Sequence, residues 1–347
     1  MRTLFLLYFT LLVNMLVLYG QSLSQRDSVR LYYHHIMLAE QKIMDEQIDS
    51  SLWNYNVASK YHKPFMTDAY NALVASVIMA DTVSSLRYVG ILVSKGIALE
   101  YFISHRLFSN MVGSSSFIKY LSQNPESKFN QKLASYISEL LQLDQKVRKV
   151  PDPYSDSTMY KTDLYIGHEM DSLFALYGYL SEDLVGVFQK TFEKLPLSWN
   201  TLDIIMIHQV KNEPAKYKMF FEDAVLDGKM KNSVLTTHAV NFGFDSTYLF
   251  KCFYFGMGDL LRVGDRYFTC GKELESLIDY NRARVYLPPL AHTIRASKYR
   301  LRNDSFLIGV KAMHFPDVTS QESIDKLVTE VTEQGYIEIY LDDEKRR

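Results

Sequence analysis

Residues 50–57 read Ser-Ser-Leu-Trp-Asn-Tyr-Asn-Val, and residues 84–91 read Ser-Ser-Leu-Arg-Tyr-Val-Gly-Ile. The second stretch begins 34 positions after the first and repeats its opening Ser-Ser-Leu and its β-branched last residue. Around both stretches, from Asp27 to about Asn110, apolar side chains recur every three or four positions. That spacing is typical of amphipathic helices. A repeat of this length therefore predicts stacked pairs of helices.

A period of 34 residues is typical of the tetratricopeptide repeat, a helix–turn–helix unit. Pro64 lies where that repeat usually carries proline, and Tyr70 takes an aromatic position early in its first helix. Leu52 and Leu86 replace the small residues that let its helices approach closely. We expect tetratricopeptide-like helical hairpins over residues 27–110. Two repeats cannot bury a continuous core alone, so they should pack on the chain that follows.

The rest of the chain predicts a helical domain over residues 129–300 and a small α/β segment over 301–347. The strongest helical pattern of the domain runs from about Phe129 to Arg148, before two prolines. The C-terminal segment reads as strand, helix and strand: 305–315, a helix opened by a Thr319-x-x-Glu322 capping box, and 336–341. The predicted fold class is mostly α, with tetratricopeptide-like hairpins packed on a helical domain and a strand–helix–strand C-terminal segment.

Residues 1–24 predict a signal peptide. Arg2 supplies a positive start, residues 4–18 are almost all apolar, and Ser22 and Ser24 fit a small-x-small cleavage site. The apolar run is shorter than the roughly 20 residues of a membrane span. We therefore expect an exported, periplasmic or secreted protein with no membrane span after cleavage. An uncleaved N-terminal membrane anchor is the alternative.

Composition excludes several classes of protein. The 347 residues contain 38 Lys and Arg against 40 Asp and Glu, so no electropositive field attracts nucleic acid, and no nucleic-acid partner is expected. Two cysteines exclude a disulfide scaffold and a four-thiolate zinc site. Cys252 and Cys270 are either one disulfide formed after export or two separate buried thiols. The chain has no phosphate loop, dinucleotide fingerprint or nucleophile elbow, and no cofactor is expected.

The run Asp144-Gln145-Lys146-Val147-Arg148 ends the helix of residues 129–148. With it, residues 30–300 resemble a family of often exported bacterial proteins of unknown function. In that family, tetratricopeptide-like helices precede a helical domain that bears Asp-Gln-x-x-Arg. Further similar stretches follow in the family's order: Tyr177-Gly178-Tyr179, Ile207-His208, 224–229, 278–282 and Leu287-Pro288-Pro289-Leu290. The chain departs from the family at Leu180, where proline is usual, and at Gln209, where a small residue is usual. The resemblance implies an architecture and candidate positions, but no reaction.

Asp144, Arg148 and His208 are the candidate catalytic residues, with Gln145 as a candidate binding residue beside them. Asp144 and Arg148 are four positions apart on one helix and can pair. His208 can join them from a later helix. A carboxylate that orients an imidazole is a recurrent general-base arrangement. The same residues can instead form a structural polar network that fixes how the helices pack.

Two further sets of residues suggest binding. Between Asp279 and Asp304 the chain has basic residues and no acidic ones: Arg282, Arg284, Arg295, Lys298, Arg300 and Arg302. They form either a site for an anionic glycan, lipid head group or protein surface, or a solvated face. His168, Glu169 and Asp171 share a helical turn near Asp163, but Ser172 stands where a zinc-protease helix needs its second histidine. We expect a solvated acidic face there and no metal.

These observations favour an exported helical-repeat protein that binds or scaffolds another envelope or secreted protein. The alternative is an enzyme of unknown chemistry that uses the Asp144, Arg148 and His208 cluster.

Overall fold

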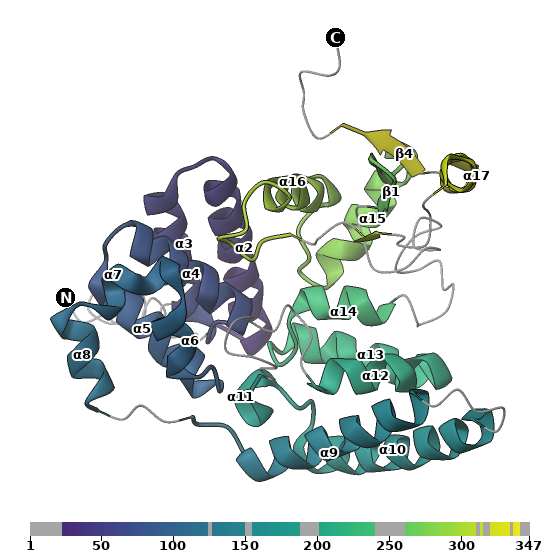
Figure 1. Ribbon diagram of the computed structural model, residues 1–347, viewed down its shortest axis with the longest axis horizontal. Coiled ribbons are helices and arrows are strands. Elements are labelled where there is room, and N and C mark those ends of the chain that lie inside the picture. The colour runs from purple at the N-terminus through teal and green to yellow at the C-terminus, as the bar shows by residue number, and fades with distance from the viewer. Residues whose placement is uncertain are drawn as a thin grey trace, which may run out of the picture.

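The computed structural model describes residues 23–123, 127–149, 155–187, 201–239, 261–309, 313–314, 320–333 and 336–340. Helices form most of this part of the chain, and a small four-stranded sheet lies toward its C-terminal end (Figure 1). The predicted fold class, mostly α with a small α/β C-terminal segment, is confirmed. The predicted signal peptide, apart from Leu23 and Ser24, lies outside the described residues.

Two helical hairpins open the fold. The first pairs α2 (Gln25–Met44) with α3 (Ile48–Tyr61), and the second pairs α4 (Met66–Ile78) with α5 (Thr82–Ser94). Helices α3 and α5 begin 34 positions apart, at Ile48 and Thr82, which agrees with the offset in the sequence.

The two hairpin turns have the same hydrogen bonds. Glu46 and Ala80, which are 34 positions apart, both have a positive φ, of 58° and 55°. In each turn this residue donates its N–H to the carbonyl three positions back, and the next residue donates to the carbonyl five positions back. This pattern is the Schellman ending of a helix, which favours glycine at the left-handed position. The repeat is therefore present in the backbone as well as in the sequence.

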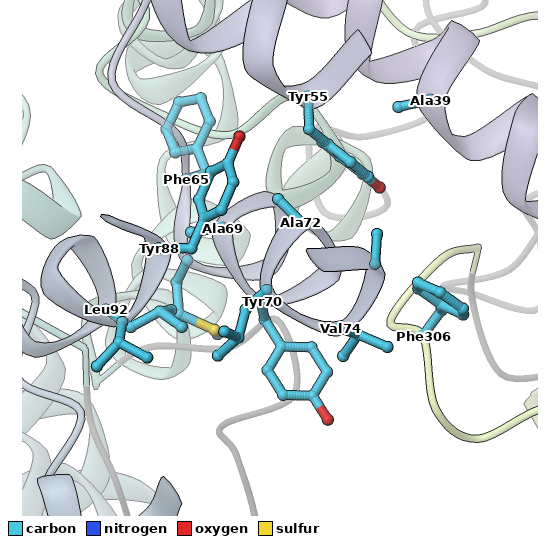
Figure 2. Packing of buried hydrophobic residues seen from close by; sticks show 14 of the residues in the cluster. Ala39, Tyr55, Phe65, Ala69, Tyr70, Ala72, Val74, Tyr88, Leu92 and Phe306 are labelled. Atoms are coloured by element: carbon cyan, nitrogen blue, oxygen red, sulfur yellow. The ribbon is translucent and has the colours of Figure 1, made fainter. Parts of the chain in front are cut away.

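Helix α4 lies at the centre of the first hydrophobic core. Every residue from Met66 to Ser76 is buried. Tyr55, Tyr88 and Leu92 belong to the same core and come from the neighbouring helices (Figure 2). Short helices complete this part of the fold: α6 (Leu99–Ser104), η1 (Arg106–Phe108), α7 (Ser109–Val112) and α8 (Ser115–Leu121).

A second group of helices has its own core. Its members are α9 (Gln131–Arg148), α10 (Ser155–Tyr177), α11 (Glu182–Val185), α12 (Thr201–Asn212), α13 (Pro214–Leu226) and α14 (Asn232–Ala239). Helices α9 and α10 lie together along the lower edge of the molecule as drawn in Figure 1. The side chain of Asn130 accepts a hydrogen bond from the N–H of Leu133 and so caps the start of α9.

The junction between the two helical parts is held by a buried cation and an aromatic ring. The Lys95 ammonium, 2% exposed, lies 2.6 Å from Asp183 and 3.2 Å from Glu182. The Phe129 ring lies against Gly96 and Gly186, where an added Cβ would be only 2.8 Å and 2.9 Å from the ring. The hairpins thus pack on the following domain, as the small number of repeats predicts.

The sheet is built from strands that come from two stretches of the chain. Its order is β3-β1-β2-β4, with β2 antiparallel to β1 and β4, and β3 parallel to β1. The strands are β1 (Leu261–Val263), β2 (Arg266–Cys270), β3 (Met313–His314) and β4 (Tyr336–Ile339). Helices α15 (Lys272–Arg284), α16 (Leu290–Arg300) and α17 (Gln321–Glu333) accompany it. The hairpin of β1 and β2 precedes residue 301, so the sheet begins before the segment in which strands were predicted.

The predicted strand over 305–315 was wrong for residues 305–309, which form no strand. Phe306 and Ile308 are instead buried in the first core, against the helical hairpins. Gly309 then turns the chain, with a φ of +63°. The helix and the last strand of the prediction are present as α17 and β4. Ser320 caps α17 by accepting the N–H of Ser323, whereas Thr319, the predicted cap, lies outside the described residues.

No helix in the described part of the chain is both long enough and apolar enough to cross a bilayer.

Candidate functional site

Asp144 is a buried carboxylate on the core-facing side of α9. The buried residues of this helix form one stripe at helical spacing: Leu133, Ile137, Leu140, Leu141 and Asp144. Asp144 thus takes the last core position of an otherwise apolar face, and its side chain is 0% exposed. An ionised carboxylate in such a place needs several hydrogen-bond donors.

Two side chains hydrogen-bond this carboxylate and a third forms an ion pair with it. Arg148 Nη1 lies 3.0 Å from Asp144 Oδ1, and the Gln145 amide donates to Oδ2 over 2.8 Å. His208 Nδ1, from α12, lies 3.0 Å from Oδ1. The structure therefore brings together all four residues that the sequence singled out around Asp144.

The hydrogen bond to Asp144 determines the role of each ring nitrogen of His208. An ionised carboxylate only accepts hydrogen bonds, so Nδ1 carries the proton in this contact. In the neutral ring Nε2 then keeps its lone pair. Nε2 makes no hydrogen bond within the described part of the chain, and the His208 side chain is 27% exposed. Chemically, this arrangement is an imidazole that can accept a proton from a molecule at the surface.

A second carboxylate completes the network. Arg148 Nη2 lies 2.6 Å from Asp163 Oδ1 on α10, so this guanidinium joins two acids from two helices. Asp163 was expected on a solvated acidic face, whereas the structure buries it. The overlooked signal is the position of Asp163 on the same helix face as the buried Ile166 and Met170.

Gln209 explains one departure from the resembled family. Its side chain is buried between α12 and α10, and its Oε1 fills the space beside Gly167. A Cβ at Gly167 would be only 2.8 Å from that oxygen. The glycine on α10 thus makes room for a long side chain where the family has a small one.

The His168, Glu169 and Asp171 side chains on α10, where a solvated acidic face was expected, do not converge. His168 is exposed, Glu169 accepts the hydroxyl of Tyr136, and Asp171 pairs with Lys216 at 2.6 Å. Among the described residues, no three His, Cys, Asp or Glu side chains lie close enough together to hold a metal ion.

The basic run of residues 282–302 does not form one cationic surface. Arg282 is 2% exposed, and its guanidinium donates to the carbonyl of Pro288 and to Thr293. Asp279 accepts the N–H of Leu290 and so fixes the turn between α15 and α16. The other basic residues are also engaged: Arg295 by Asp45, Lys298 by the Tyr340 carbonyl, Arg300 by the Gly309 carbonyl, and Arg284 and Arg302 by further contacts.

The disulfide prediction is not tested by the structure. Cys252 lies outside the described residues, and Cys270 ends β2, where it pairs with Tyr336 of β4 in the sheet.

An exposed apolar surface on α10 was missed in the sequence. Large apolar side chains along the two flanks of its exposed side have between 48% and 71% of their surface exposed: Tyr160, Leu164, Tyr165 and Leu176. We call these four residues the α10 surface. The signal was available, because the apolar residues of α10 extend beyond the face of the buried Ile166 and Met170 to both of its flanks.

Comparison with known proteins gives no relative. No family model matches the chain, and neither a curated protein nor a solved structure does.

Proposed function

We propose that this chain is an exported protein that acts by binding another envelope or secreted protein. The observation that carries this proposal is the α10 surface, where four large apolar side chains stand exposed on one helix. Exposed large apolar side chains on one helix favour an interaction site, because exposing them to water is unfavourable. Tyrosine, which contributes two of the four, is enriched in protein interfaces.

Export is part of the proposal and is supported by the sequence of the first 24 residues. The first described helix, α2, begins at Gln25, immediately after the predicted cleavage position. Membership of the resembled family is likewise proposed. It is supported by the Asp144, Gln145 and Arg148 motif, whose side chains lie together with His208.

Site-specific photo-crosslinking tests the binding surface. A photoreactive amino acid at Leu164 should crosslink to one defined protein in cells that produce the chain naturally. The same amino acid at Val83 is the control, because Val83 is 81% exposed but lies on α5, away from the α10 surface. The proposal predicts a crosslinked partner from position 164 only. Equal crosslinking from both positions, or none from 164, would contradict it.

A second candidate function rests on His208. We infer that the partly exposed His208 imidazole, held by the contact between Nδ1 and Asp144, can act through Nε2 as a general base in an enzyme of unknown chemistry. The test incubates small-molecule extracts of the same cells with purified wild type or with His208→Gln. A compound consumed by wild type alone, while both proteins have the same circular dichroism spectrum, supports this candidate. Unchanged extracts in both reactions count against it.

A further inference from the structure

Asn71 holds the backbone of Leu307 from both sides. The Leu307 N–H donates to Asn71 Oδ1 over 2.6 Å, and Asn71 Nδ2 donates to the Leu307 carbonyl over 3.3 Å. The two residues are 236 positions apart, and Asn71 is fully buried on α4. Because both bonds go to main-chain atoms, Asn71 recognises an extended peptide without reading the side chain of the bound residue.

The residues on either side of Leu307 supply the apolar contacts. Phe306 is 2% exposed and Ile308 is 0% exposed, and both belong to the core around α4. In Figure 2, Phe306 lies beside Val74 of α4, on a segment that approaches this helix from outside the hairpins. The core around α4 thus packs against large apolar side chains two positions apart, which is the spacing of one face of an extended chain; we call this contact region of α4 the Asn71 groove.

Charge complementarity extends the contact toward the N-terminal side of this segment. Helix α16, which precedes it, lies beside α2 (Figure 1). His292 Nε2 of α16 lies 3.1 Å from Glu40, and Arg295 lies 2.6 Å from Asp45. The part of the chain that contacts the hairpins therefore has basic side chains on α16, followed by the aromatic-x-aliphatic pair of Phe306 and Ile308.

We propose that this Asn71 groove is an exchangeable peptide-binding site, and that residues 305–308 are its intramolecular ligand. A partner protein with basic residues followed by an extended aromatic-x-aliphatic segment displaces them. The site is separate from the α10 surface, so either surface can fail its test while the other passes. Because the intramolecular ligand has an effective concentration on the order of millimolar, it masks the groove until such a partner is present.

Peptide binding to an emptied groove tests the recognition chemistry. The full chain with Phe306→Ser and Ile308→Ser is titrated with a fluorescent peptide of residues 303–309. Binding is expected for this variant and should be at least about 100-fold weaker for wild type. Methylating the peptide nitrogen of Leu307 removes the donor to Asn71 and should weaken binding roughly tenfold, whereas Asp304→Ala in the peptide should not. A folded variant that ignores the peptide, or binds the methylated form equally well, overturns the proposal.

Hydrogen exchange in the wild-type chain tests whether the ligand is released. The Leu307 amide should exchange at least about tenfold faster than the amides of α4, because the segment opens while the hairpins stay folded. Exchange of Leu307 only through global unfolding would make residues 305–308 permanent core and overturn the proposal. If the double variant does not fold, Ile308→Ala replaces it, and the peptide must then raise its Tm. If the chain forms a dimer and the peptide dissociates it, the groove binds a second copy of the chain, and the proposal of a different partner protein is overturned.

Discussion

His208 lies 3.0 Å from Asp144, a residue 64 positions earlier in the chain, and the carboxylate it contacts is completely buried. Arg148 contacts the same carboxylate oxygen at 3.0 Å. The pair therefore has a structural role in joining α9 to α12, whatever chemistry Nε2 of His208 performs. Stability measurements separate these two roles.

Asp144→Ala is expected to lower the free energy of unfolding by about 3–5 kcal/mol, because it leaves the partly buried Arg148 without this partner. His208→Gln should cost only about 1 kcal/mol, since the imidazole is partly exposed. Urea unfolding measures both changes. The control is Asp171→Ala, which breaks the exposed pair with Lys216 and should cost less than about 1 kcal/mol. Equal losses for Asp144→Ala and Asp171→Ala would show that the buried network stabilises the fold no more than an exposed ion pair does.

Gly96→Ala should destabilise the junction of the two helical parts by roughly 1–3 kcal/mol. The added Cβ would lie 2.8 Å from the Phe129 ring, and the backbone there has a φ of +98°. Gly113→Ala is the matched control, because its φ is −72° and the nearest atom would be 3.6 Å away. That control should leave the Tm unchanged or raise it slightly. A harmless Gly96→Ala would mean that Phe129 does not pack as described.

Ala80→Gly is expected to stabilise the chain by about 0.5–1 kcal/mol. Ala80 has a φ of 55°, a left-handed conformation that costs a residue with a Cβ about 1–2 kcal/mol, part of which glycine regains. Glu46→Gly in the equivalent turn should act in the same direction. Ala72→Gly, in the buried middle of α4, should instead destabilise. A loss of stability from Ala80→Gly would contradict the Schellman geometry of the turn.

The stability of the fold should depend on pH through His62. Burial lowers the pKa of the His62 imidazole below its usual range, and the charge of Lys95 lowers it further. The unfolded chain, with an ordinary pKa of about 6.5, therefore binds this proton more readily than the folded chain. The stabilising effect is complete above about pH 6.5 and is lost as the pH falls through the folded value. Urea unfolding at pH 7.5 and 5.5 should show a smaller difference for His62→Gln than for wild type.

The helical hairpins were predictable because their signals are local. Apolar spacing and the 34-residue offset between Ser50 and Ser84 both arise within single hairpins. The pairing of Asp144 with Arg148 is local too, since the two are four positions apart on one helix.

The conformations of residues 305–309 and of the β1 and β2 hairpin depend on contacts that no local sequence pattern encodes. Phe306 and Ile308 alternate as a strand does, but the partner that binds the backbone of Leu307 between them is Asn71, far away on α4. The hairpin of β1 and β2 gives little local signal, because β1 has only three residues and Arg266 lies on the same face as the buried Phe268. Local propensity cannot identify such segments, since their pairing partners determine their conformation.

The most direct test of the central claim is affinity capture of the chain from cells that produce it naturally. Wild type is compared with the Tyr160→Ser, Leu164→Ser double variant, with Val83→Ser and with His208→Gln, all confirmed as folded. Our account predicts that one protein is recovered with wild type, Val83→Ser and His208→Gln, and that it is lost from the α10 double variant. Recovery of that protein with the double variant, or its loss with His208→Gln alone, would contradict the account.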